Sequence, residues 1–299
     1  MMQVDTSEDR DGQLPMAQRS LTEGLSFHPD FALPDANVVI AAKDAKMYFR
    51  VHSYTLKTTS GFFRTMYSLP QSEANGDIMY LDEDSATLEH LLRMICGLPF
   101  PEIESHDMLD ALLSAAEKYD MPGPLSLLRM YLLRNPSPLE DVVRLYAVAT
   151  RYGWVQEAKV LSGRTLVIDL HDDAYTSSLR TLSTDALLSL YKLHRIRKVG
   201  LLNCLNSPPF VSGEPQHCVQ CDSIITYTTW KELKFRIVLE MDERPLGDTI
   251  LNEGLCSWSE ATACWRAACS NEICKRLLYD RSETMRMIKE CIDGLPKSI

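Results

Sequence analysis

The chain has 299 residues, of which 45% are apolar and 24% charged, and this length predicts roughly two globular domains. Its 41 acidic residues outnumber the 31 basic ones, and the formal net charge of −10 disfavours binding to a phosphate backbone. No run of about 18 uncharged apolar residues occurs, so no membrane span is expected. The nine cysteines are an odd number in a chain long enough to fold without disulfides. We therefore expect reduced thiols or metal ligands, and a location in the cytoplasm and/or nucleus.

The N-terminal segment differs from the rest in composition. Residues 1–26 contain no aromatic side chain, are rich in acidic and polar residues, and lack the apolar run of a signal peptide. Because too little apolar surface is available to offset the entropy of ordering the chain, we expect a disordered tail. Ordered structure is expected to begin near Phe27.

The pattern that follows predicts a small sheet with two short helices. Two apolar runs separated by a polar turn predict a β-hairpin, and a third strand is expected after a loop at 71–77. The expected elements are strands at 38–42, 47–51 and 78–81, the turn at 43–46, and helices at 52–59 and 61–67. The expected core residues are Val38, Ile40, Phe49, Val51, Leu56, Phe62 and Phe63. The ring of His52 is expected to bond nearby backbone where the second strand becomes a helix, rather than to act in catalysis.

Longer helices are expected next. Leucine and isoleucine at positions i, i+3, i+4 and i+7 predict a helix at 85–96 that Gly97 should end. A second helix is expected at 105–119. A Pro-Gly-Pro run at 122–124 predicts a break before a third helix at 125–134.

The run Asn135–Pro138 is expected to be the main domain boundary, because its two prolines prevent a continuous helix. Beyond it, amphipathic stripes without strand signals predict a helical bundle, with helices at 139–146, 157–169 and 184–199. A basic run at 194–198 is interpreted as the cationic end of the last of these helices, which suits the helix dipole. His171, beside Asp172 and Asp173, is interpreted as part of a helix cap rather than a metal site.

The last third is less regular. Residues 224–230 favour a strand, whereas 230–241 could equally form a helix. Residues 254–280 are expected to be helical around Trp258 and Trp265.

The motifs of common enzymes are absent from the sequence. It contains no phosphate-binding glycine loop, nucleophile elbow or zinc-protease motif, so no catalytic residue is expected and the chain is not expected to be an enzyme. The best metal candidate is Cys218 with Cys221, since a Cys-x-x-Cys turn can place two sulfurs on one zinc ion. A complete site needs two more ligands, and the spacings among Cys264, Cys269 and Cys274 predict sulfurs too far apart along a helix. Zinc therefore stays open beside ordinary buried thiols, and no other cofactor is expected.

Several linked motifs resemble the BTB/POZ domain over residues 30–135. In that family a strand delivers a histidine into a helix, with a leucine four residues later and a Ser-x-x-Phe beyond, as in Phe49–Leu56 followed by Ser60–Phe63. Three further segments resemble the family's third strand with its acidic turn, the next helix and the penultimate helix: 78–85, 88–97 and 115–121. The residues that carry this signature are Phe49, His52, Leu56, Phe62, Phe63, Leu88 and Tyr119.

The resemblance implies an α+β, mostly α protein: a BTB/POZ domain with a small three-stranded sheet and helices, followed by a helical bundle. It implies a BTB/POZ domain at 27–135 and a BACK-like helical extension at 136–206, and it leaves 207–299 as a mixed, mainly helical region. The whole arrangement is most similar to the BTB proteins of mushroom-forming fungi. Two departures, Cys96 at a helix corner and Asn37 where a charged dimer pocket has Asp, argue against a transcription-factor type of homodimer.

The resemblance implies that the chain is a protein–protein interaction module, either a substrate adaptor for a cullin-type ubiquitin ligase or a regulatory scaffold. Its partners would be proteins, including a cullin or a second copy bound through the BTB domain. The alternative, drawn from the residues, is a zinc-binding regulatory factor that uses the C-terminal cysteines. No membrane partner is expected, and the acidic charge disfavours nucleic acid.

Overall fold

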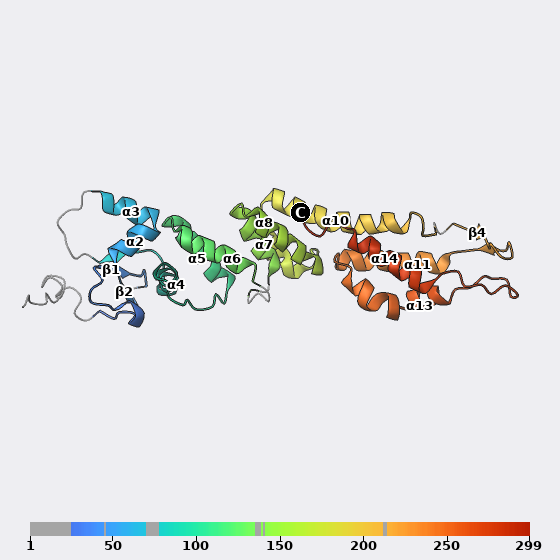
Figure 1. The fold of residues 1–299 in the computed structure, drawn as a ribbon, viewed down its shortest axis with the longest axis horizontal. Helices are drawn as coiled ribbons and strands as arrows, with labels where there is room; N and C mark the ends of the chain where they lie inside the picture. Colours follow the sequence, from blue (N-terminus) through green and yellow to red (C-terminus); the bar gives the residue numbers. More distant parts are fainter. Residues whose placement is uncertain (1–24, 45, 70–77, 135–138, 140, 212–213) are drawn as a thin grey trace, which may run out of the picture. The chain divides into compact units, whose positions relative to one another are not determined.

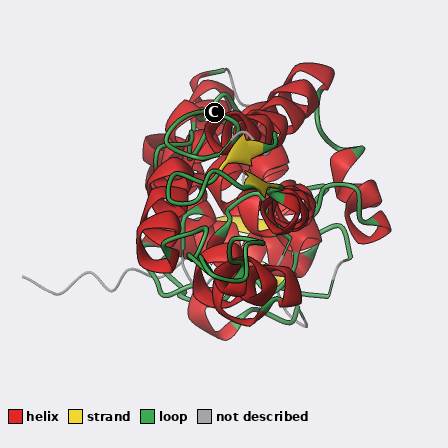
Figure 2. Cartoon of the chain, turned by 90° about the vertical axis from the view of Figure 1, so that its right-hand side faces the viewer, coloured by secondary structure: helices red, strands yellow, loops and turns green. Residues whose placement is uncertain are grey.

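The computed structural model describes residues 25–44, 46–69, 78–134, 139, 141–211 and 214–299. The expectations for the tail up to residue 24, the loop at 71–77 and the boundary at Asn135–Pro138 lie outside these residues, as does Ala45 of the expected turn. Helices predominate and strands are few, which confirms the α+β, mostly α class (Figure 2). The described residues fall into two compact units, divided after Leu139.

A three-stranded sheet organises the first unit (Figure 1). It consists of β1 (Val38–Ala41), β2 (Tyr48–Val51) and β3 (Met79–Tyr80) in the order β2-β1-β3. β1 is antiparallel to β2 and parallel to β3, so that the register pairs Ile40 with both Phe49 and Met79. These strands lie within a few residues of the positions expected from the apolar runs, because the alternation of half-buried and buried side chains specifies the register.

The first unit also contains a short 3-10 helix and five longer helices. They are η1 (Pro29–Phe31), α2 (Ser53–Thr59), α3 (Gly61–Ser68), α4 (Ser85–Cys96), α5 (His106–Lys118) and α6 (Pro122–Leu132). Asp84 caps α4 by accepting the Thr87 N–H, and Gly97 ends it in the left-handed conformation at φ 70°. The break expected at 122–124 is wrong, because these residues form the first turn of α6. Backbone N–H groups in a first turn have no partner within the helix, so a proline there costs no hydrogen bond.

The core of the first unit contains most of the expected residues. Ile40, Phe49, Leu56 and Phe63 are almost fully buried, and Val51 is also buried. Two core expectations are wrong: Val38 is half-buried, and the ring of Phe62 is 43% exposed.

The second unit is helical apart from one short hairpin. Its elements are α7 (Val142–Arg151), α8 (Val155–Arg164), η2 (Thr165–Val167), η3 (Asp173–Tyr175), α9 (Thr176–Leu179), α10 (Thr184–Leu205), β4 (Gln216–His217), β5 (Ile224–Ile225), α11 (Thr228–Glu243), η4 (Ile250–Gly254), α12 (Leu255–Ser257), α13 (Ser259–Arg266) and α14 (Arg281–Asp293). The long α10 packs against both α11 and α14. Its C-terminal half shares one core with them, including Leu201, Trp230, Ile237 and Ile288. The α10 helix therefore joins the residues before 206 and those after it into one unit.

The interpretation of the basic run 194–198 as a helix end is wrong, because α10 continues to Leu205. Arg197 is only 1% exposed. Its guanidinium donates hydrogen bonds to four carbonyl oxygens, those of Pro245 (2.6 Å), Leu246 (3.0 Å), Leu295 (3.3 Å) and Pro296 (2.7 Å). One side chain thus joins α10 to the turn after α11 and to the segment after α14.

The expectation of a helix across 254–280 is correct only for its first half. After Arg266 the chain leaves the helix, and a single bridge pairs Ala268 with Leu277. The helix α14, which the sequence reasoning missed, begins with the Asp280 side chain accepting the Glu283 N–H. Among the described residues, no helix is both long enough and apolar enough to cross a membrane.

Candidate functional site

The signature residues of the first unit connect its secondary-structure elements. Phe49, Leu56, Phe63, Leu88 and Tyr119 are all at most 3% exposed. The rings of Phe63 and Tyr119 stack with centroids 5.6 Å apart, and Phe62 meets both rings edge-on. These contacts explain why aromatic side chains occupy these positions, since edge-on and stacked pairs add to the stability from area burial.

His52 has a different role from the one expected. Its ring is exposed, makes no hydrogen bond to the start of α2, and lies with Nε2 3.6 Å from Asp35 Oδ2. Asn37 caps the helix instead: its Oδ1 accepts the Ser53 N–H at 2.9 Å, and its Nδ2 donates to Ser53 Oγ at 3.0 Å. The amide at position 37 therefore holds β1 against the start of α2.

Ser60 links α3 to the end of α5. Its hydroxyl donates to the carbonyl of Tyr119 at 2.5 Å and accepts the Phe63 N–H at 3.1 Å. The Tyr119 hydroxyl donates to the carboxylate of Glu83. Burial is the larger cause of the raised pKa of this phenol, and the hydrogen bond to Glu83 is the second. Lys118 Nζ lies 3.0 Å from carboxylate oxygens of both Asp82 and Glu83. The acidic turn before α4 is thereby fixed to the end of α5.

The first unit also exposes large apolar side chains. Tyr54 on α2 is 73% exposed. Phe62 is 43% exposed on α3, the helix that packs against α2. Tyr80 on β3 and Met130 on α6 are 67% and 72% exposed. Tyrosine, phenylalanine and methionine are enriched in the centres of protein interfaces, so these helices carry side chains suited to docking.

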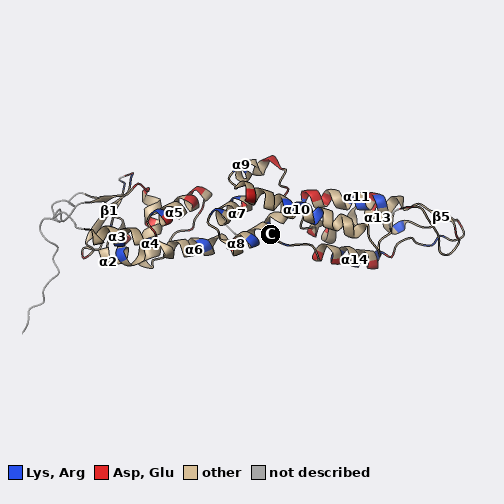
Figure 3. Ribbon diagram, turned by 90° about the horizontal axis from the view of Figure 1, so that it is seen from above, with Lys and Arg blue, Asp and Glu red and all other residues tan. Residues whose placement is uncertain are grey.

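Basic and acidic residues both occur along the helices in Figure 3. Several cations are already paired, such as Arg286 with Glu283 and Lys198 with Asp242. A nucleic-acid interface needs clustered unpaired cations, so this distribution gives no support for one in the part of the chain that the structure describes.

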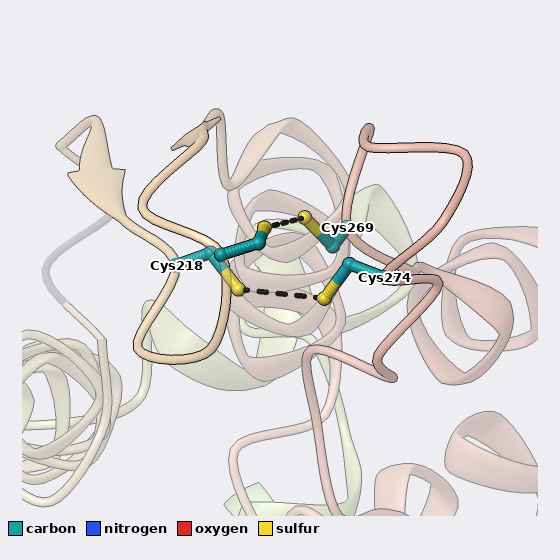
Figure 4. A group of neighbouring side chains, drawn as sticks. Cys218, Cys269 and Cys274 are labelled. Carbon is teal, nitrogen blue, oxygen red and sulfur yellow. Dashed lines mark hydrogen bonds between the residues drawn. The ribbon is translucent and has the colours of Figure 1, made fainter.

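Four cysteine thiols meet in the second unit: Cys218 and Cys221 after β4, and Cys269 and Cys274 after α13. Their sulfur atoms all lie within 4.8 Å of one another, with 3.9 Å between Cys218 and Cys274 and 3.5 Å between Cys221 and Cys269. Figure 4 shows the labelled thiols pointing toward one another from two loops. The expectation that Cys269 and Cys274 lie too far apart along a helix is wrong, because both stand in a loop.

Backbone N–H groups surround this cluster. The N–H groups of Gln220 and Cys221 lower the pKa of the Cys218 thiol. The hydroxyl of Ser223, followed by its N–H, lowers the pKa of Cys221 to about 6. On the other loop the N–H of Asn271 points at Cys269 and lowers the pKa of its thiol, but desolvation and hydrogen bonds with the neighbouring thiols outweigh this effect and raise the pKa to about 11. Like charges this close oppose one another, so four thiolates cannot form together without a cation.

Neighbouring groups do not join the cluster. His217 turns its Nδ1 to the carbonyl of Asp222 at 2.8 Å, and Cys264 is buried in α13, where desolvation raises the pKa of its thiol to about 12. Cys96 and Cys256 are exposed elsewhere. The Cys-x-x-Cys motif therefore signalled half of the site, and the other half required knowledge of the loop after α13.

A cavity of about 390 Å³ in the second unit is lined in part by Asp169, His171 and His194. His194 Nε2 lies 3.0 Å from Thr165 Oγ1, and burial lowers the pKa of its ring to about 4. The Thr165 hydroxyl donates to a backbone carbonyl, so the neutral ring must donate from Nε2. His194 is thus held as a buried structural group. Asp172 accepts a backbone N–H at the start of η3, as the cap interpretation of this region expected.

Comparison with known proteins identifies the first unit. Among curated proteins, no sequence matches the chain. The family model of the BTB/POZ domain matches residues 33–136, the same part of the chain that forms the three-stranded sheet with its helices. BTB domains are protein-interaction modules and are not typically catalytic. Residues 33–136 of this protein are therefore a BTB/POZ domain.

Proposed function

We propose that the protein acts by binding other proteins through its BTB/POZ domain. The observation that carries this proposal is the family match at 33–136, since domains of this family mediate protein interaction and dimerisation. Support comes from the exposed apolar side chains of α2 and α3, which have the composition of interface centres.

The more specific role is that of a substrate adaptor for a cullin-type ubiquitin ligase. The BTB/POZ domain binds the N-terminal domain of the cullin, and the second unit holds the client protein. This assignment is favoured by the order of the two units along the chain. A regulatory scaffold uses the same domain but requires no cullin, so the two roles differ in a single binding reaction.

Binding of the full chain to an immobilised cullin N-terminal domain tests the adaptor role. We expect micromolar binding or tighter, and at least a tenfold weakening in the variant Tyr54→Glu, because a carboxylate in a desolvated interface loses its hydration. Val155→Glu is the matched control: Val155 is 71% exposed at the start of α8 in the other unit, and it gains the same charge. Absence of binding at about 100 μM, roughly a hundredfold weaker than the expected micromolar affinity, would exclude the adaptor and leave the scaffold.

The second candidate function is a zinc-binding regulatory factor. The convergence of Cys218, Cys221, Cys269 and Cys274 favours its metal-binding part. The acidic net charge disfavours a direct role on DNA, so zinc in this protein would support a protein-binding unit. Metal analysis of the purified chain separates a zinc protein from a zinc-free one.

A further inference from the structure

We propose that Cys218, Cys221, Cys269 and Cys274 form a structural zinc site that joins two loops of the second unit. The site is independent of the role of the BTB/POZ domain, since all four ligands belong to residues after Leu139. Either proposal can therefore fail without the other.

The separations of the sulfur atoms fit one metal ion. Tetrahedral zinc holds thiolate sulfurs at about 2.3 Å, which places any two of them about 3.8 Å apart. The sulfur atoms of Cys221 and Cys269 lie 3.5 Å apart, those of Cys218 and Cys274 lie 3.9 Å apart, and every other pair is separated by at most 4.8 Å. A disulfide would bring two sulfurs to about 2.05 Å, and all four cysteines are free. The four thiols thus surround a position that a zinc ion can fill with little movement.

Both loops also share one local geometry. The residue directly after the second cysteine of each pair, Asp222 in one loop and Lys275 in the other, has a left-handed backbone with φ of 59° and 42°. That conformation turns the next N–H back toward the preceding sulfur, so Ser223 N–H faces Cys221 and Arg276 N–H faces Cys274. Non-glycine residues rarely adopt positive φ. Its occurrence after both cysteines indicates that the loops are shaped around the sulfurs.

Apolar burial does not account for the order of the loop tips. Val219, between the first two cysteines, is 84% exposed, and Ile273, just before Cys274, is 97% exposed. A few polar contacts cross between the loops, such as Asn271 Nδ2 donating to Ser223 Oγ at 3.2 Å. Each loop contributes one buried cysteine, Cys218 or Cys269, and one half-buried cysteine, Cys221 or Cys274, and a shared metal ion would fix all four.

Four protein ligands leave no open position on the metal for substrate or water, so the site is structural rather than catalytic. Along the sequence, Cys221 and Cys269 are 48 residues apart, and Cys218 and Cys274 are 56 residues apart. Zinc binding displaces the thiol protons to solvent, changes no oxidation state, and is favoured only in the folded chain. Loss of the metal should therefore loosen both loops and the hydrophobic core to which Cys218 and Cys269 belong.

The test measures metal in the full chain, purified under reducing conditions without chelator. We expect about one zinc per chain, and X-ray absorption at the zinc edge should show only sulfur ligands at about 2.3 Å. The double variant Cys218→Ser/Cys221→Ser should lose the zinc, and its second unit should melt about 10 °C lower or more. The control Cys96→Ser/Cys256→Ser also removes two of the nine cysteines, both of them exposed, and should keep the metal and the melting temperature.

Three results would overturn the proposal. The first is a folded wild-type chain that contains no zinc and takes up none when zinc is added. The second is a zinc shell with nitrogen or oxygen ligands. The third is a mass lower by four hydrogens, which would show two disulfides in place of the metal site. Because all three are measured on the wild-type chain, the test stands even where the cysteine variants fail to fold.

Discussion

Replacing Arg197 with methionine should destabilise the second unit more than any single change at an exposed position. The guanidinium is buried and donates to the carbonyls of Pro245, Leu246, Leu295 and Pro296. Methionine fills much of the same volume but offers no donor, so the four carbonyls lose their shared partner.

The magnitude follows from those four hydrogen bonds. Hydrogen bonds that involve a charged group contribute about 1.5–3 kcal/mol each, and the cost of desolvating the guanidinium, several kcal/mol, offsets part of their sum. We therefore expect the free energy of unfolding to fall by about 3–5 kcal/mol. Arg197→Lys should recover only part of this loss, because one ammonium group cannot reproduce the planar fork of donors.

Urea denaturation followed by tryptophan fluorescence measures this effect, because all four tryptophans belong to the second unit. The matched control is Arg195→Met, an exposed position on the same helix, which should change the stability by about 0.5 kcal/mol or less. Zinc and reductant are kept constant throughout. Equal stability of the Arg197 and Arg195 variants would refute the role assigned to the buried guanidinium.

Three further predictions concern pH and the first unit. The pKa of His194 is lowered to about 4 in the folded chain, against about 6.5 in the unfolded chain, so this group does not affect stability above pH 6.5 and lowers it by up to about 3 kcal/mol as the pH drops from 6.5 to 4. Urea titrations at several pH values should show a weaker dependence of stability on pH for His194→Gln than for the wild type. An unchanged pH dependence would contradict the burial of the ring. Ser60→Ala removes both a cap and the bond to the Tyr119 carbonyl, and calorimetry should report a loss of about 2 kcal/mol from the first unit, with a loss near zero counting against that link. Gly97→Ala should cost about 1 kcal/mol through its positive φ alone, because no atom lies within 4 Å of the added carbon, and a neutral result would mean that the α4 terminus relaxes.

The first unit was predictable because its signals are local. Alternating apolar residues predicted the strands, helical spacing predicted α4 and α5, and Gly97 predicted the end of α4. The errors have physical reasons: Phe62 lies on a partly exposed face of α3, and a proline in the first turn starts a helix as readily as it ends one. Asn37 was recognised as a departure from the family pattern, but its capping of α2 depends on the packing of β1.

The second unit was harder to predict because its key interactions join distant residues. Cations are rarely buried, so the sequence around Arg197 gave no reason to expect four carbonyl partners from two distant segments. The helix α14 buries only three residues, Thr284, Ile288 and Ile292, among many charged ones, and its apolar stripe is correspondingly weak.

The candidate metal site was half predictable. Cys218 and Cys221 are adjacent in a recognisable motif, whereas Cys269 and Cys274 are separated by four residues in a segment whose composition resembles a helix. Their approach to the first pair depends on the shape of two loops, each with one left-handed residue directly after its second cysteine, Asp222 in one and Lys275 in the other. No periodicity in the sequence encodes such a contact.

The most direct test of the central claim, that the BTB/POZ domain is a protein-docking unit, is the molar mass of the full chain by light scattering. Measurements cover the chain alone up to about 100 μM and the chain mixed with an equimolar cullin N-terminal domain. We expect a mass above the 33.9 kDa of one chain in at least one of these conditions, through a second copy or through the cullin. A mass that stays at 33.9 kDa alone, together with an unshifted cullin peak in the mixture, would contradict it.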